Sequence, residues 1–285
     1  MVFGFPIVGL ILDGFYVVSI ILLVALGLAI YFGLVGVFNI AHGEFLVMGS
    51  YMVVFLQQYV GFWWCLAVAP AITALMGLVL ERGMIRHFYA KPILGFIGTW
   101  GVSLILQQSY GLVFGNVYYF AKNPLPFTVL VFGFSYSAYQ LFVIATGGLA
   151  FLAFVFVFLK TGLGARIRAA IHNPQMAAAL GINVERIYVT AFVFGSALAG
   201  FGGAILGPMI PVFPYIGFYY VPQAFYTVML GGLGQVLGIG ISSLVVGQIA
   251  NTLNYSLPAG IAQTALLVVV IVIMRVRPQG IWSRG

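Results

Sequence analysis

Residues 230–240 read LGGLGQVLGIG, and this glycine-rich stretch determines how the chain crosses the membrane. It lies inside an apolar segment, 222–248. Seven further apolar segments occur along the chain, at approximately 5–35, 45–61, 62–80, 93–114, 138–159, 187–207 and 255–274. Most of them approach or exceed the roughly 20 residues that a helix needs to cross a bilayer. The segments therefore predict a multi-pass membrane protein.

The composition indicates the same class. The chain has 285 residues, of which 63% are hydrophobic and 5% are charged, whereas a soluble domain carries about 25% charged residues. The short alternating segments of a membrane β-barrel are missing from the sequence. We expect an all-α integral membrane protein, a single transmembrane domain over residues 1–285, with about seven to eight transmembrane helices and one broken glycine-rich segment. The net charge of +7 comes from basic residues in loops and does not indicate nucleic-acid binding.

Basic residues predict which ends of the segments face the cytoplasm. Ten of the eleven fall into three clusters, after the third, the fifth and the last segment: Arg82, Arg86 and Lys91; Lys160, Arg166, Arg168 and Arg186; Arg275, Arg277 and Arg284. The positive-inside rule places all three clusters and the C-terminus in the cytoplasm. The loop 115–137, with Lys122 and a turn at Asn123-Pro124-Leu125-Pro126, is then external.

This orientation restricts the glycine-rich segment. Segment 187–207 must lead outward and segment 255–274 must return, so 222–248 cannot be one simple crossing. We predict a broken or re-entrant element, or two half-helices meeting at Gly231-Gly232-Leu233-Gly234. Irregular backbone at membrane depth is tolerated where it is buried in protein or lines a wet cavity, which makes Gly231, Gly232 and Gln235 candidates for the wall of a translocation pathway. Close helix packing through small residues explains the glycines equally well.

Polar residues interrupt the stretch FNIAHGEFLVMGSYM, residues 38–52, at Asn39, His42 and Glu44. We expect a tight connection at the cytoplasmic boundary or recessed into the protein. Ionisable groups at membrane depth are usually functional. Asn39 as an N-cap, with Glu44 near the positive end of the next helix, is the first interpretation; contact with a transported solute and a His42–Glu44 proton relay are the others. We also expect Asp13 to break the first segment after an interfacial start; a strongly tilted helix is the alternative.

A polar stripe marks the fourth segment. Thr99, Ser103 and Gln107 are spaced four residues apart and therefore share one helix face. Hydroxyls and amides both donate and accept hydrogen bonds, as recognition of a neutral polar solute requires. We place the stripe in the candidate pathway, although interhelical hydrogen bonding is a common alternative.

Local signals predict a short helix in the cytoplasmic loop 160–186. Asn173 is a good N-cap, Pro174 suits the first helical position, and Gly181 suits a left-handed stop. Arg166 and Arg168 precede this helix. Its alanine-rich surface, including Ala177 and Ala178, fits docking to a cytoplasmic protein as well as it fits a solvated loop.

Three motifs carry a resemblance that covers nearly the whole chain: FNIAHGEFLVMGSYM, ARIRAAIHNPQMAAALGINVERI and TVMLGGLGQVLG. In this order they resemble the membrane permeases of branched-chain amino acid-type ABC importers. Two further pieces, TWGVSLILQQ at 99–108 and RPQGIW at 277–282, resemble the urea and short-chain-amide branch.

The resemblance implies a bacterial inner-membrane permease that pairs with a second homologous permease subunit. It implies two cytoplasmic ATPase subunits and a periplasmic solute-binding protein as partners, with the 173–181 helix touching the ATPase and Arg166 and Arg168 beside that contact. The sequence contains no G-x-x-x-x-G-K-[ST] phosphate loop. We therefore expect no catalytic residue, metal or cofactor on this chain, and ATP on the partner ATPase. The solute would be urea, a short amide or a branched-chain amino acid.

Three rival functions stay open at this point. A passive channel for small neutral solutes would need no ATPase. A proton-coupled carrier would use His42 and Glu44. A membrane enzyme has little support, because the sequence lacks H-E-x-x-H and G-x-S-x-G motifs and paired carboxylates.

Overall fold

The computed structural model describes residues 5–36, 38–89, 91–131, 133–232, 234–277 and 280–281. Helices dominate this part of the chain. They are α1 (Phe5–Val35), α2 (His42–Val60), α3 (Phe62–Gly83), the 3-10 helix η1 (Ile85–Phe88), α4 (Pro92–Phe114), α5 (Ala138–Lys160), α6 (Gly162–His172), α7 (Pro174–Ala179), α8 (Val184–Leu206), α9 (Gly217–Gly231), α10 (Val236–Ser256) and α11 (Ala259–Val276). The strands β1 (Thr128–Val131) and β2 (Phe134–Ser137) form an antiparallel hairpin.

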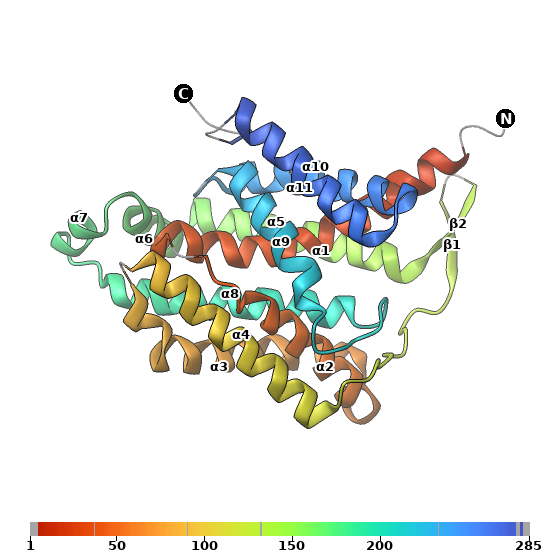
Figure 1. Ribbon diagram of the computed structural model, residues 1–285, viewed down its shortest axis with the longest axis horizontal. Helices are drawn as coiled ribbons and strands as arrows, with labels where there is room; N and C mark the ends of the chain where they lie inside the picture. The colour runs from red at the N-terminus through yellow and green to blue at the C-terminus, as the bar shows by residue number, and fades with distance from the viewer. Residues whose placement is uncertain are drawn as a thin grey trace.

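The helical bundle has two distinct ends (Figure 1). One end carries α6, α7 and the last turn of α11, and we call it the arginine-rich end. The other end carries the β1–β2 hairpin and the beginning of α1, and we call it the hairpin end. Residues Arg284, Pro278, Gln279 and Trp282, the last three from the RPQGIW motif, lie outside the described residues.

Helix α1 is the central element of the bundle and packs against α5, α8, α9 and α10. Its 31 residues correspond to about 46 Å of helix, which exceeds the thickness of a bilayer core. The predicted break at Asp13 is wrong, because the helix runs through this position without interruption. The Asp13 carboxylate accepts hydrogen bonds from Tyr136 Oη at 2.9 Å and from Gln140 Nε2 at 3.3 Å. These partners allow the charge to be accommodated inside a helix.

The glycine-rich segment is broken as predicted. Helix α9 ends at Gly231 and α10 begins at Val236, with Gly232 and Gly234 between them at φ values of 86° and 73°. Only glycine adopts such values at little cost. Helix α9 has 15 residues, or about 22 Å, too short to cross the hydrocarbon core of about 30 Å.

Glycines bring the central helices into backbone contact. A Cβ atom on Gly49 of α2 would lie 2.0 Å from the carbonyl oxygen of Gly200 on α8, and a Cβ on Gly203 would lie 1.9 Å from that of Leu46. Gly27 of α1 meets Gly195 of α8 in the same way. This is the close approach that small residues permit between membrane helices.

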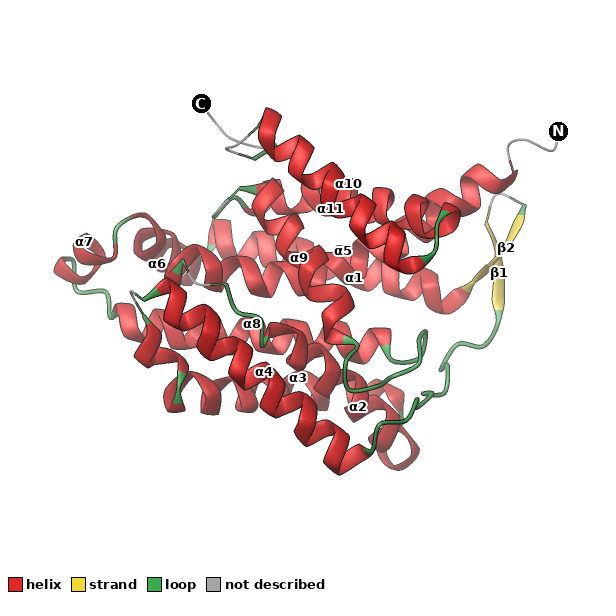
Figure 2. Cartoon of the chain, in the orientation of Figure 1, coloured by secondary structure: helices red, strands yellow, loops and turns green. Residues whose placement is uncertain are grey.

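The hairpin end holds the only strands in the described part of the chain (Figure 2), and the sequence analysis did not predict them. Within the predicted turn, the Asn123 side chain accepts a 2.9 Å hydrogen bond from the Leu125 amide. Tyr119 and Val212 form an isolated two-way backbone bridge, with N···O distances of 2.9 and 2.8 Å. The bridge ties the connection after α4 to the connection after α8.

Six helices in the described ranges are long and apolar enough to cross a membrane, namely α1, α3, α5, α8, α10 and α11. Helix α4 has 23 residues, so it is long enough as well, and its polar stripe lowers its hydropathy. The chain is therefore an all-α integral membrane protein, with α9 as a shorter element inside the bundle.

Candidate translocation site and docking helix

The connection between α1 and α2 is recessed deep into the bundle. His42, the first residue of α2, places its Nε2 atom 3.1 Å from the carbonyl oxygen of Val24. Val24 lies eleven residues before the end of α1 at Val35, which is about 16 Å of helix. Helix α2 therefore begins about one third of the way along α1 from the arginine-rich end. Of the two predicted positions, the recessed one is correct.

The polar stripe of α4 faces this recessed connection. Glu44 Oε1 accepts hydrogen bonds from Ser103 Oγ and Gln107 Nε2, each at 2.8 Å. Thr99 Oγ1 accepts a 3.3 Å hydrogen bond from the Ile40 amide. All three stripe residues are buried, which confirms that they share one face. Two motifs that are about 60 residues apart in the sequence therefore form one buried polar cluster.

The cluster contains polar atoms that are buried without partners. Among the described residues, neither amide atom of Asn39 and only one carboxylate oxygen of Glu44 has a hydrogen-bond partner. The prediction that Asn39 caps α2 is wrong, since the N-cap position is Ala41 and no side chain caps it. Glu44 does lie in the first turn of α2, where the helix dipole favours a negative charge.

Helices α2 and α9 meet at their beginnings. A Cβ atom on Gly43 would lie 3.1 Å from the Cα atom of Gly217 and 2.5 Å from Val221 Cγ2. From this contact α2 runs toward the hairpin end and α9 runs toward the arginine-rich end. Both helices thus place their N-terminal, electropositive ends inside the bundle. Helices that begin inside the membrane in this way commonly form the solute sites of transporters.

The turn between α9 and α10 lies at the arginine-rich end. A Cβ atom on Gly33, near the end of α1, would lie 3.7 Å from the Gly234 amide nitrogen, and one on Gly234 would lie 3.5 Å from Ile171 of α6. The Leu230 carbonyl accepts a 2.7 Å hydrogen bond from the Ile281 amide. Gln235 occupies the N-cap position of α10 without a side-chain capping bond. The predicted pathway residues of this turn therefore lie beside the end of α1 and α6, and not in the Glu44 cluster.

The predicted short helix of the arginine-rich end is present as α7. The Asn173 side chain accepts a 2.9 Å hydrogen bond from the Met176 amide, Pro174 is the first residue of the helix, and Gly181 has a φ of 82°. All three local predictions are confirmed. The expected outward face is partly wrong, because Ala177 is only 2% exposed.

Two apolar residues of the α7 region that sequence reasoning missed point outward. Met176 is 59% exposed and Leu180 is 74% exposed. They are four residues apart, which is the spacing of neighbours on one helix face. The exposed Ala178 lies between them in sequence. An exposed apolar pair of this kind, outside the transmembrane helices, is available for contact with another protein.

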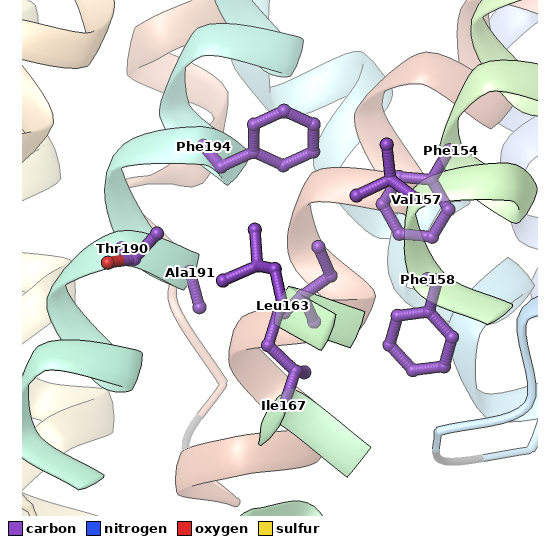
Figure 3. Close-up of a pocket in the computed structure, with 9 residues that line it drawn as sticks. Phe154, Val157, Phe158, Leu163, Ile167, Thr190, Ala191 and Phe194 are labelled. Carbon is purple, nitrogen blue, oxygen red and sulfur yellow. The ribbon is translucent and has the colours of Figure 1, made fainter. Parts of the chain in front are cut away.

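Helix α6 joins α7 to the transmembrane helices. Figure 3 shows Leu163 and Ile167 of α6 between the aromatic rings of α5 and Phe194 of α8, in an apolar hollow. The Arg168 guanidinium carbon lies 5.5 Å from the centroid of the Phe158 ring, a cation–π geometry, whereas Arg166 is exposed. A displacement of α7 would therefore change the packing of α6 against α5 and α8.

The carboxamide side chains at the end of α10 differ in what they contact. Gln248 Nε2 donates to the Ile11 carbonyl at 3.2 Å, and Asn251 Nδ2 donates to the Leu10 carbonyl at 2.8 Å, so both fasten α10 to α1. Asn254 instead lines a cavity of about 280 Å³ at the hairpin end, together with Gln223 and Gln263. Sequence reasoning did not single out Gln223 or Gln263, because their partners in the cavity come from distant helices.

Comparison with known proteins identifies the family. The profile of the branched-chain amino acid transport system permease component matches residues 10–276. The chain belongs to this family. The permease LivH of the high-affinity branched-chain amino acid transport system of Escherichia coli (strain K12) is 30% identical over 92% of this chain and 91% of its own length. The permease BraD of Pseudomonas aeruginosa is 28% identical, over 82% of each chain.

A second kind of relative matches as well. The permease LivM of the same E. coli system is 26% identical over 80% of this chain and 60% of its own length. No solved structure is significantly similar to the chain. Family membership and the apolar helices together make this chain a multi-pass inner-membrane permease of the branched-chain amino acid type.

Proposed function

We propose that this permease is the membrane subunit of an ATP-driven importer, with α7 as the element that docks onto a cytoplasmic ATPase. The observation that carries the proposal is the exposed pair Met176 and Leu180 on a capped helix at the arginine-rich end. This end would face the cytoplasm by the positive-inside rule. Since the chain has no phosphate-loop motif, ATP would bind to partner subunits.

The remaining partners follow from the same scheme. The chain resembles both LivH and LivM, which are permeases of one E. coli system, and this supports pairing of two homologous permease subunits. A periplasmic binding protein would deliver the solute to the hairpin end. The solute would be urea, a short-chain amide or a branched-chain amino acid.

Two exposed leucines provide a matched test of the docking role. Leu180 on α7 and Leu130 on the hairpin are 74% and 75% exposed, at opposite ends of the bundle. Leu180→Asp should weaken co-purification of the ATPase at least tenfold and reduce ATP-dependent uptake in proteoliposomes in proportion. Leu130→Asp should leave co-purification of the ATPase unchanged. Equal ATPase recovery with both variants would contradict the docking role.

A proton-coupled carrier is the second candidate, and the buried Glu44 carboxylate is the observation that favours it. The two functions differ in their energy source. Uptake by the importer should require ATP and persist after the proton gradient has been collapsed. Uptake without ATP that depends on the gradient, and is lost in Glu44→Gln, would select the carrier.

A further inference from the structure

The cavity at the hairpin end differs in chemistry from the rest of the bundle. It lies between the first half of α1, the beginnings of α9 and α11, the last turns of α10 and the connection that follows α8. Its polar lining consists of three phenols and three carboxamides, from Tyr16, Tyr219, Tyr220, Gln223, Asn254 and Gln263. Among the described residues that line it, none is charged.

Gln223 is the most informative of these residues. It is only 8% exposed, and the described part of the chain shows no hydrogen bond from its side-chain amide. Gln248 and Asn251 on α10, by contrast, donate to carbonyls of α1. Gln223 instead lines the cavity, so its donors and its acceptor are available to a bound molecule.

We propose that this cavity is the first solute-binding site on the permease, and that it takes a neutral solute with a urea or carboxamide group. The inference deepens the proposed function and rests on it. Side-chain amides and phenols both donate and accept, which matches the N–H and C=O groups of such a solute. A cavity of about 280 Å³ is at the lower limit of ligand pockets and suits a small molecule.

The missing charge argues against an amino acid in this cavity. A zwitterion carries an ammonium and a carboxylate, and burying either without an ionic partner is costly. The cavity therefore favours a solute without net or separated charges.

Helix α9 connects the cavity to the recessed polar cluster. Tyr219, Tyr220 and Gln223 line the cavity, while Gly217 and Val221 of the same helix contact Gly43 of α2. The first turns of α9 thus form the wall between the cavity and the cluster.

Cysteine protection tests the site directly. Cys65 is the only cysteine and is buried, so introduced cysteines can be labelled selectively. Asn254→Cys and Tyr255→Cys would be compared in the assembled complex in nanodiscs, where both faces are accessible. Both residues are exposed, but Asn254 lines the cavity and the neighbouring Tyr255 does not. A hydrophilic methanethiosulfonate reagent should label both positions.

Acetamide and urea should slow labelling of Asn254→Cys at least threefold and leave Tyr255→Cys unaffected, whereas leucine should protect neither. Protection by leucine alone would overturn the solute class. An Asn254→Cys thiol that is not labelled, or that no solute protects, would overturn the site. These outcomes need no ATP hydrolysis, so they are independent of whether the importer function holds.

A transport measurement separates the two proposals. Relative to the amount of assembled complex, Gln223→Leu should raise the KM for ATP-driven amide uptake at least tenfold. The matched control is Gln58→Leu, because Gln58 is exposed at the end of α2. Wild-type uptake with an unchanged KM in Gln223→Leu would reject the cavity as the site and leave the importer standing. Absence of ATP-dependent uptake in the wild type would reject the importer.

Discussion

The Glu44 carboxylate, in the first turn of α2, accepts a 2.8 Å hydrogen bond from the side-chain amide of Gln107, 63 positions away on α4. Ser103 donates to the same oxygen, and the Tyr110 hydroxyl donates to the Glu44 backbone carbonyl at 3.0 Å. Helix α4 makes few other contacts with the bundle, chiefly with η1. This cluster is therefore the main attachment between α4 and the recessed connection.

Replacing Glu44 should separate the structural role of the cluster from a role of its charge. Glu44→Leu leaves the buried Ser103 hydroxyl without its acceptor, at about 1–3 kcal/mol, and leaves the Gln107 amide with only its 2.9 Å hydrogen bond to Ser103 Oγ, so the melting temperature of the purified protein should fall. Glu44→Gln keeps an acceptor and should retain both stability and uptake. A stable Glu44→Gln variant without any transport would instead assign a function to the negative charge.

Replacing Asn39 should impair transport without the loss of stability expected for Glu44→Leu. Because its amide has no partner within the described residues, Asn39→Ala should keep or raise the melting temperature while it lowers the rate of solute uptake. Ser50→Ala is the control, since Ser50 Oγ donates a 2.8 Å hydrogen bond to the Gly203 carbonyl and its loss should lower stability. A clear loss of stability in Asn39→Ala would show that the amide has a structural partner.

Backbone contact between α2 and α8 should make Gly49 intolerant of any side chain. The Cβ atom of Gly49→Ala would lie 2.0 Å from the Gly200 carbonyl oxygen, so the helices must move apart and the melting temperature should fall by several degrees. Gly101→Ala on α4 meets nothing within 4 Å, and it should be neutral or stabilising by up to about 1 kcal/mol. Similar melting temperatures for the two variants would contradict the close packing.

The cap of α7 offers a test of local order. Asn173→Ala removes the hydrogen bond to the Met176 amide, at a cost of about 1 kcal/mol to this short helix. Amide hydrogen exchange in residues 174–180 should accelerate and ATPase co-purification should weaken, while the melting temperature of the bundle stays constant. Asn173→Ser, which can still cap, should restore both measurements. Unchanged exchange in Asn173→Ala would show that packing alone holds α7.

Local chemistry made part of the structure predictable from sequence. The ends of α7 follow from Asn173, Pro174 and Gly181, because capping depends on residues within one turn. The break between α9 and α10 follows from the placement of basic residues, which restricts the number of crossings. The common face of Thr99, Ser103 and Gln107 follows from helix periodicity.

Features that depend on distant partners were missed. Asp13 remains inside α1 because Tyr136 and Gln140 donate to it, and no pattern around Asp13 indicates those residues. Ala177 is buried and Leu180 is exposed because of how α6 seats α7 on the bundle, which the alanine-rich local sequence does not reveal. The cavity lining is drawn from α1, α9, α10 and α11, so no single motif contains it.

The starts of α2 and α9 inside the bundle have a consequence for biosynthesis. A segment whose first turn lies within the membrane cannot insert into lipid on its own, since the unpaired amides of that turn would be left in hydrocarbon. Helix α2 leaves the ribosome long before α8 and α9, against which it packs. We therefore expect nascent α2 to remain in a shielded or interfacial position until α8 and α9 have been synthesised and inserted. Chains truncated before Val184 should then be degraded by membrane quality-control proteases.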